Sequence, residues 1–395
     1  MYLTRLQEAM LKGEYGWSTA KAVEILVKVG ESMGAERLIE IVHAHVSGVS
    51  FSNIGVYGAE FIRELYEKGG RARVYTTVNP GGVDYSSLQS IIDNSLMTQQ
   101  AVIDSALTGM GFKPVFTCIP YWYRPPAPGE HLAWGESSAV IVANSIYGGF
   151  TNREGGPVTL AAALTGFTYD AGLHKLENRV IEVSIEVSRE ASGYPSGAIG
   201  LWIGENIREK PLLTFARRLS LLELKVLLAA MAASGSHALA VIPGWTPQGT
   251  YSLDVRENIT IEAGDLEKYI GGEYSLNGEI LGYTGCPHLS LEEIMEVARI
   301  LRRRGYRAPR RGKLLITIPA EYPSRFKWIV SELVSRGVEI AAGTCPVVSV
   351  LRRRYDVVVT NSGKAAFYLR RIHGLRVKIA GLREVVEAVY GELAG

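Results

Sequence analysis

The sequence predicts an α/β protein built from several units with mostly parallel sheets. Strand-like and helix-like stretches alternate over residues 35–82, and the alternation resumes from about residue 221 to the C-terminus. Parallel strands need a long crossover, usually a helix, so this alternation favours parallel sheets covered by helices. The length of 395 residues exceeds what one core usually organises, so we expect more than one unit. We predict a division into 1–115, 116–220 and 221–395.

The first third shows helical apolar spacing, then a strand, a helix and another strand. Ser18 is placed where it could cap the first of these helices. The expected elements are a helix over 17–34, a strand running into a loop over 35–48, a helix over 56–70 closed by glycines, and a strand over 71–82 that ends in a turn.

The middle is less regular than the C-terminal part, which resembles a doubly wound layer. For the middle we expect a helix over 86–111, a short strand over 113–122, two helices flanking a glycine-rich polar loop over 129–167, and strands over 178–206. For the C-terminal part we expect a helix over 219–235 followed by the apolar run 237–244, then strands starting near 281, 313, 338, 356 and 375, with helices over 290–305, 322–337, 361–374 and after 381.

The composition excludes several classes of protein. The formal charge of +2 is too close to balance for a nucleic-acid surface. The charged N-terminus does not suit a signal peptide, and the apolar stretch 219–235 is interrupted by charges and too short to cross a membrane. We therefore expect a cytoplasmic protein without nucleic acid or membrane as partner. The basic stretch 301–313 fits a solvated helix end or a docking surface for a partner chain.

Three isolated cysteines follow strand-like runs, at positions 118, 286 and 345. Cys286 and Cys345 share one setting, a Thr or Gly before the cysteine and a proline after it. No CxxC pair occurs, which argues against a zinc finger. Loops at the carboxyl ends of parallel strands can converge, and thiolates select iron–sulfur clusters or zinc. From the residues alone, three buried core thiols and one shared metal centre both stay open.

A second candidate is the stretch "GESSAVIVANSIYGGFTNREGGP", residues 135–157. Glu136, Ser137, Asn144 and Arg153 gather there beside glycines. Such polar groups suit an oxygen-rich anion, because arginine pairs with carboxylate or phosphate and short side chains donate hydrogen bonds. A helix cap followed by an ordinary turn explains the same residues equally well.

Three further loops carry polar or small residues after a strand. Residues 43–55 and 76–84 offer backbone N–H groups to an anion, or are plain connections. Residues 357–369 resemble the end of a phosphate loop but lack its upstream glycine, which leaves Lys364 as an anion contact or an exposed side chain. His288 lies two residues after Cys286 and is a candidate acid or base. Hydrolase, zincin and dinucleotide motifs are missing in the required contexts.

Together these motifs resemble the catalytic large subunit of the aconitase X family, over nearly the whole chain. The resemblance is carried by "SGVSFSNIG", "TTVNPGGVD", "TCIPYW", "GESSAVIVANSIYGGFTNREGGP", "GCPHLSLEEI", "GTCPVVS" and "TNSGKAAFYL". It implies an aconitase-like fold around a central iron–sulfur site, most similar to the archaeal type. That type removes water from (R)-5-phosphomevalonate to give trans-anhydromevalonate 5-phosphate, in the modified mevalonate route to isoprenoids.

The resemblance also implies a cofactor and a set of site residues. Cys118, Cys286 and Cys345 would hold a 4Fe–4S cluster whose fourth iron acts as a Lewis acid on the substrate hydroxyl. Glu136, Ser137 and His288 are the expected catalytic residues. The expected substrate contacts are Gly48, Val49, Ser50, Asn79, Pro80, Glu136, Ser137, Asn144, Arg153 and Lys364.

Aconitase-like enzymes use a serine from a swivelling domain as the base, and we expect that domain to be absent from this chain. The resemblance implies a small subunit that supplies it and forms a heterodimer. The alternatives are dehydration of cis-3-hydroxy-L-proline or another aconitase-type reaction, and, in another class, an iron-sensing RNA-binding protein. Near-neutral charge argues against the last of these.

Overall fold

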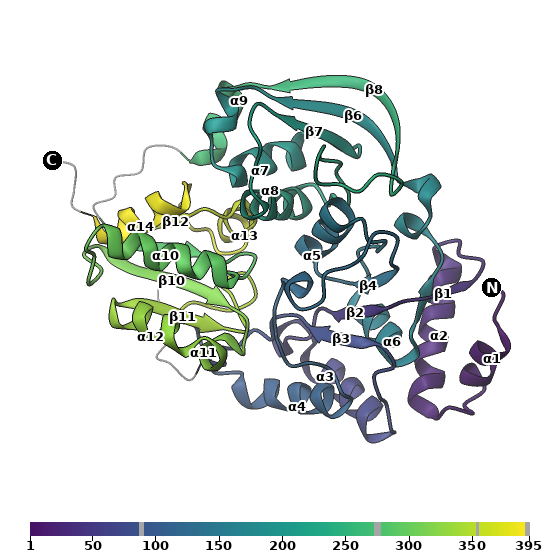
Figure 1. The fold of residues 1–395 in the computed structure, drawn as a ribbon. Coiled ribbons are helices and arrows are strands. Elements are labelled where there is room, and N and C mark those ends of the chain that lie inside the picture. The colour runs from purple at the N-terminus through teal and green to yellow at the C-terminus, as the bar shows by residue number, and fades with distance from the viewer. Residues whose placement is uncertain (87–90, 272–277, 353–354, 392–395) are drawn as a thin grey trace. The chain divides into compact units, whose positions relative to one another are not determined.

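The computed structural model describes residues 1–86, 91–271, 278–352 and 355–391, and it divides into two compact units (Figure 1). Unit 1 comprises Met1–Gly82, Ser95–Glu182 and Ala238–Asp254. Unit 2 comprises Val83–Asn94, Val183–His237 and Val255–Gly395. Each unit is therefore assembled from separate stretches of chain. The expected division into 1–115, 116–220 and 221–395 stays a prediction.

Unit 1 contains a parallel three-stranded sheet in the order β3-β2-β4. In the register, His45 of β2 lies beside Thr77 of β3 and Trp134 of β4. Helix α6 packs on β2 and β4, and α2 packs on α6. The elements are α1 Arg5–Leu11, α2 Trp17–Ser32, β1 Leu38–Glu40, β2 His43–Val46, α3 Phe51–Glu67, β3 Tyr75–Val78, α4 Met97–Gly109, β4 Leu132–Trp134, α5 Ser137–Val142, α6 Gly156–Thr165 and β5 Phe167–Tyr169.

Unit 2 contains a five-stranded parallel sheet in the order β11-β10-β9-β12-β13. Helix α14 packs on β9 and β10 and contacts α10, while α13 packs on α7 and α8. The elements of this layer are α7 Ser196–Asn206, α8 Leu221–Ser234, β9 Ile280–Thr284, α10 Leu291–Arg303, β10 Gly312–Ile318, α11 Tyr322–Arg325, α12 Lys327–Ser335, β11 Val338–Ala342, β12 Val357–Thr360, α13 Gly363–Arg371, β13 Val377–Ile379 and α14 Leu382–Tyr390.

Chain order and spatial order in this sheet define a topological switch point. The first strand in sequence, β9, lies in the middle, and the chain moves outward to β10 and β11 before returning to β12 on the other side of β9. Ligands of open α/β sheets bind beyond the carboxyl ends of the strands at such a reversal. The loops that follow β9 and β12 are therefore the first place to look for a site.

Helix starts in unit 2 follow from local sequence. Ser220 and Ser290 cap α8 and α10, and Glu223 and Glu293 return a hydrogen bond to complete each capping box. Acidic residues occupy the first turn of α10 and arginines its last turn, as the helix dipole favours. Helix α8 is buried almost all round, which explains its nearly continuous apolar sequence.

A smaller sheet, β7-β6-β8, completes the structure, with β6 Val180–Val187, β7 Pro211–Phe215 and β8 Ser252–Ile261. Helix α9, Ala263–Ile270, follows β8. Mostly parallel pairing is confirmed, since among the described strands whose pairing is given only β1 with β5 is antiparallel.

Several expected elements were wrong. The second half of the predicted strand region 178–206 is helix α7, whose apolar residues are buried on all sides and so lack a clear helical period. The expected strand over 113–122 makes only an isolated bridge at Lys113 and ends in a 3-10 helix over Pro120–Trp122, and the described part of 86–96 is not helical. Ser18 does not cap α2, because Gly16 precedes the helix and the Ser18 hydroxyl donates to Leu65 O at 2.7 Å.

The chain shows no described helix that is both long and apolar enough to cross a membrane.

Candidate active site

The carboxyl edge of the unit 1 sheet gathers most of the polar loops singled out in the sequence. Two extended segments widen the sheet: Thr117 N donates to Val78 O at the end of β3, and Glu154 N donates to Trp134 O at the end of β4. Because all of these segments run in parallel, their following residues meet at one edge. Those residues are Gly48–Ser50, Asn79, Cys118, Glu136, Ser137 and Arg153.

The loop after β2 is held by a glutamine that sequence reasoning missed. The Gln100 amide on α4 donates to Val49 O at 3.1 Å and accepts from Phe51 N at 2.7 Å. Ser50 precedes α3 as its N-cap, and Gly48 adopts a φ of 67° that favours glycine. Gln100 lies some 50 residues from this loop in sequence, so no local motif connects the two.

Asn79 follows β3 and contacts a buried histidine. Its Oδ1 lies 3.4 Å from His45 Nε2, and His45 Nδ1 lies 2.8 Å from the Thr77 hydroxyl. Asn79 is half-buried, whereas Pro80 beside it is buried. Burial lowers the pKa of His45 to about 4, and the Glu136 carboxylate only partly opposes this shift. The His45 imidazole is therefore neutral at physiological pH.

Glu136 is both a helix cap and a polar group of the site. Its Oε2 accepts from Ala139 N at 2.7 Å and from the Ser138 hydroxyl at 2.6 Å, which starts α5. Its Oε1 accepts from the Ser137 hydroxyl at 3.4 Å. The helix-cap interpretation and the site interpretation of Glu136 are therefore compatible, because the cap fixes the carboxylate at the carboxyl edge.

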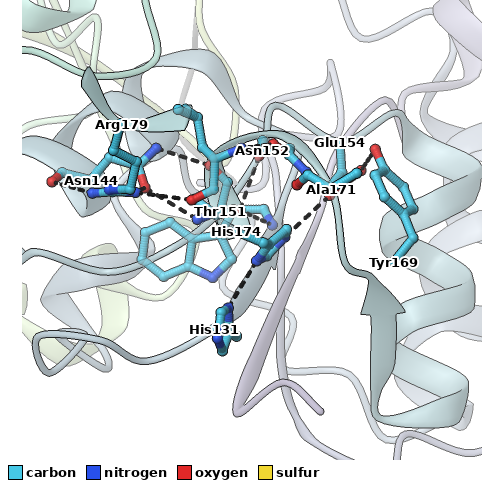
Figure 2. Close-up of polar contacts among 11 residues, drawn as sticks. His131, Asn144, Thr151, Asn152, Glu154, Tyr169, Ala171, His174 and Arg179 are labelled. Atoms are coloured by element: carbon cyan, nitrogen blue, oxygen red, sulfur yellow. Dashed lines mark hydrogen bonds and ion pairs between the residues drawn. The ribbon is translucent and has the colours of Figure 1, made fainter. Parts of the chain in front are cut away.

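Asn144 lies in a buried network with Arg179, which Figure 2 shows. The Asn144 amino group donates to Thr151 O and Ala238 O, and its carbonyl accepts from Thr151 N and Arg179 Nη1. These four bonds use the full hydrogen-bonding capacity of a carboxamide. A substrate contact at Asn144 would have to break one of them.

The loop that carries Arg153 is fixed through its neighbour Glu154. Glu154 is 2% exposed and accepts a hydrogen bond from the Tyr169 hydroxyl at 2.6 Å. His174 Nε2 lies 3.6 Å from the other carboxylate oxygen, and His174 Nδ1 lies 3.0 Å from His131 Nδ1 (Figure 2). Arg153 itself is exposed. Glu154 lies within the polar stretch 135–157, where no local motif marks it out.

In unit 2, Cys286 follows β9 and Cys345 follows β11, and the two thiols meet. Both are buried, at 5% and 6% exposure. A hydrogen bond from the Cys286 thiol lowers the pKa of Cys345, helped by the Val347 and Val348 N–H groups and by the Lys364 ammonium, while burial opposes the shift. A thiolate at Cys345 is therefore stabilised by groups already in place.

Lys364 lies in the first turn of α13, directly after the loop that follows β12 at the switch point. Ser362 caps α13, and its hydroxyl also donates to Cys286 O. The Thr284 hydroxyl at the end of β9 donates to Asn361 Oδ1 at 2.8 Å. These bonds tie the loops after β9 and β12 together, and they hold the buried Lys364 beside the two cysteines.

His288 is fully buried and connects the two cysteine loops. Its Nε2 lies 2.9 Å from Thr344 O, the residue before Cys345. Its own carbonyl accepts from Lys225 Nζ at 3.0 Å, and Lys225 pairs with Glu293, which belongs to the capping box of α10. Lys225 and Glu293 are further residues that the sequence gave no reason to select.

The thiol pair of unit 2 fits two ligands of an iron–sulfur cluster. Such clusters are held by thiolates and tuned by N–H groups that point at sulfur; the pKa of Cys345 is lowered, and the Val347 and Val348 N–H groups are directed at its sulfur. Among the residues that the structure describes, no cluster of three or more His, Cys, Asp or Glu side chains could hold a metal ion. Cys118 lies at the carboxyl edge of unit 1 and is 8% exposed.

Comparisons with known proteins agree over nearly the whole chain. The chain matches models described as the aconitase X first domain over residues 1–177, second domain over 178–271 and third domain over 280–391. A phosphomevalonate dehydratase large subunit of Thermococcus kodakarensis is 38% identical over 98% of this chain and 99% of that protein. A cis-3-hydroxy-L-proline dehydratase of Pseudomonas aeruginosa is 29% identical over 98% of this chain and 70% of that protein.

A solved structure shows the same fold. The crystal structure of Thermococcus kodakaraensis aconitase X in its holo-form matches with a TM-score of 0.85 at 36% identity, covering 98% of this chain and 100% of that chain.

Proposed function

This chain belongs to the aconitase X family, and we propose that it is the large subunit of an iron–sulfur dehydratase that converts (R)-5-phosphomevalonate to trans-anhydromevalonate 5-phosphate. The observation that carries the proposal is the meeting of Cys286, Cys345 and Lys364 at the carboxyl edge of the unit 2 sheet. The 38% identity to a phosphomevalonate dehydratase large subunit supports this substrate over a proline derivative, whose dehydratase is the more distant relative.

Cys286 and Cys345, together with Cys118, are the proposed ligands of a 4Fe–4S cluster. When bound, a cluster with one iron not held by protein supplies a Lewis acid for the departing hydroxyl. The family relationship suggests an iron–sulfur cofactor, and the thiol pair of unit 2 supports two of the three ligands.

The remaining groups bind and orient the substrate. Lys364 is buried and cationic, so it suits a carboxylate or phosphate of the substrate. In unit 1, Asn79 and the Gly48–Ser50 loop offer donors to anionic oxygens, and Val49 and Pro80 shape the same loops. Glu136 offers carboxylate oxygens as acceptors, and the Ser137 hydroxyl, which donates to Glu136 Oε1, offers its oxygen as a further acceptor. The exposed Arg153 guanidinium suits a second anionic group of the substrate.

The reaction removes one proton and one hydroxide, and together they leave as water. The base that takes the proton is assigned to a small subunit, because the archaeal relative is named a large subunit. His288 acts through Cys345: its bond to Thr344 O fixes the loop that carries that thiol.

The test is turnover by the chain co-expressed with its small subunit under anaerobic conditions. (R)-5-phosphomevalonate, unphosphorylated mevalonate and cis-3-hydroxy-L-proline are supplied separately, and products are followed by proton and phosphorus NMR. We expect the phosphorylated substrate alone to lose water. Turnover of the proline derivative without turnover of phosphomevalonate would contradict the proposal.

Lys364→Met tests the anion contact. Loss of a charge-assisted hydrogen bond of about 1.5–3 kcal/mol predicts a rise in KM for phosphomevalonate of about ten-fold or more. Lys313→Met is the matched control, because Lys313 begins β10 at the opposite end of the same sheet and pairs with Glu339. Equal KM values for the two variants would remove Lys364 from the substrate site.

A further inference from the structure

A chain of side-chain hydrogen bonds runs through the unit 1 sheet to Asn79. His43 Nε2 lies 2.9 Å from the Thr77 hydroxyl, and the same hydroxyl lies 2.8 Å from His45 Nδ1. His45 Nε2 in turn lies 3.4 Å from Asn79 Oδ1. His43, Thr77 and His45 are all 0% exposed. A continuous series of polar contacts therefore runs along the adjacent strands β2 and β3, from His43 to Asn79 at their carboxyl edge.

The Thr77 hydroxyl forces this series to have a direction. A hydroxyl carries one proton, so Thr77 donates to one imidazole and accepts from the other. In one direction, His43 donates to Thr77, Thr77 donates to His45, and His45 Nε2–H donates to Asn79 Oδ1. In the other direction every donor and acceptor is exchanged, and the Asn79 carboxamide would have to present its amino group to His45.

His43 Nδ1 decides between the two directions. It is buried and has no hydrogen-bond partner within the described residues. If His43 accepted from Thr77 through Nε2, its proton would sit on Nδ1 and be buried without an acceptor, and such orphaned N–H groups are rare and costly. If His43 donates through Nε2, only a lone pair is left at Nδ1. The first direction is therefore favoured.

We propose that His43, Thr77 and His45 are positioning residues that turn the Asn79 carboxamide so that its carbonyl faces His45 and its amino group is offered to the substrate. In the part of the chain that the structure describes, the Asn79 amino group has no hydrogen-bond partner, although its carbonyl is occupied by His45. Asn79 therefore acts as a donor, which suits a carboxylate or phosphate oxygen. That the ligand is phosphomevalonate rests on the proposed function; the direction of the series does not.

Both rings must be neutral for this arrangement, since a protonated imidazole would donate from both nitrogens. Burial lowers the pKa of His43 well below its usual range and that of His45 to about 4. Trp134 contacts both rings edge-on, with centroids 5.1 and 6.2 Å from those of His43 and His45. This packing holds the rings in place, so a purely structural role for them is the competing explanation.

The tautomers give a test that needs no substrate. The full chain is labelled with ¹⁵N-histidine, and the ring nitrogens are observed by NMR at pH 7, with His43→Gln and His45→Gln used to assign the signals. We expect both rings to be neutral and protonated at Nε2. A proton on Nδ1 of either ring would overturn the proposal, whatever reaction the enzyme performs.

Kinetics then separate positioning from packing. In Thr77→Val the hydroxyl is lost with little change in shape, so the carboxamide is free to turn; we expect KM for phosphomevalonate to rise about ten-fold, with kcat changed less. Thr77→Ser keeps the hydroxyl and should rescue KM to within about two-fold. Thr76→Val is the control, because within the described residues the Thr76 hydroxyl bonds Val74 O, just before the same strand, and neither histidine.

Equal KM values for Thr77→Val and Thr77→Ser, or a loss of stability without any change in KM, would contradict the positioning role. If the wild-type enzyme does not turn over phosphomevalonate, the proposed function is wrong. The tautomer measurement alone then tests the direction of the hydrogen bonds from His43 to Asn79.

Discussion

At the scale of single residues, buried polar groups stabilise unit 1 only while their partners are present. Glu154 is buried and depends on the Tyr169 hydroxyl for its 2.6 Å hydrogen bond. Burial and the neighbouring Glu154 carboxylate both raise the pKa of Tyr169, so the phenol stays protonated and remains the donor. The pair therefore holds the loop of Arg153 against β5.

Tyr169→Phe should therefore destabilise the protein by about 1–3 kcal/mol, because it leaves a buried carboxylate oxygen without its donor. Urea unfolding followed by fluorescence measures the change. Tyr57→Phe is the control: Tyr57 is 86% exposed, and its change should stay within about 0.5 kcal/mol. If the two variants unfold at the same urea concentration, the Glu154 contact contributes nothing.

Stability should also fall in mild acid because of the two buried neutral histidines. Burial depresses the folded-state pKa of His43 and His45, whereas the unfolded chain takes up protons near the ordinary value of about 6.5. Between that pH and about 4 the unfolded state binds more protons, so the free energy of unfolding falls as pH falls. Each ring contributes up to about 1.4 kcal/mol per pH unit.

Urea unfolding of the wild type and of His45→Gln at pH 7.5, 6.5 and 5.5 measures this slope. The free energy of unfolding of the variant should fall less between pH 7.5 and 5.5 than that of the wild type, because one of the two titrating rings has been removed. Identical declines in both proteins would mean that His45 is not held neutral by burial.

At the scale of elements, capping and periodicity made much of unit 2 predictable. Helix α10 carries a Ser290–Glu293 capping box and an amphipathic pattern, and β9, β10 and β11 are short apolar runs between turn signals. Helix α7 was missed because its apolar residues and glycines give no helical period, and its helical state depends on packing against α8 and α13.

The crossing of α7 and α13 depends on glycine at both helices. A Cβ added at Gly363 would lie 2.2 Å from Gly197 O, and one added at Gly197 would lie 2.5 Å from Gly363 N. Neither clash involves a flexible side chain. The close approach places the start of α13, and hence Lys364, next to α7.

Gly363→Ala should therefore cost about 1–3 kcal/mol and raise KM as Lys364 is displaced. Gly264→Ala is the control, since nothing lies within 4 Å of its Cβ in α9 and alanine favours a helix. Thermal unfolding and KM are compared in both variants. A Gly363→Ala protein as stable as the wild type would show that the crossing tolerates a side chain.

At the scale of the whole molecule, the sequence motifs and the division of the chain between the two units differ in how much local signal they leave. The motifs around Cys286, Cys345 and Lys364 were recognisable in sequence, and the structure brings these three together. Each unit is built from three separate stretches of chain. Local sequence patterns do not predict this division, because it depends on contacts between residues that are distant in sequence. Gln100 and Thr77 were missed for the same reason, since their partners lie far away in sequence.

We propose that the three single cysteines hold one iron–sulfur cluster. The direct measurement is an anaerobic absorption spectrum, with iron and sulfide analysis, of the chain co-expressed with the proposed small subunit. Cys118→Ala, Cys286→Ala and Cys345→Ala are measured beside it. We predict a brown protein with about four irons and loss of the cluster in every variant. A colourless protein whose three thiols titrate freely would contradict the claim, and so would a Cys118→Ala variant that keeps its cluster.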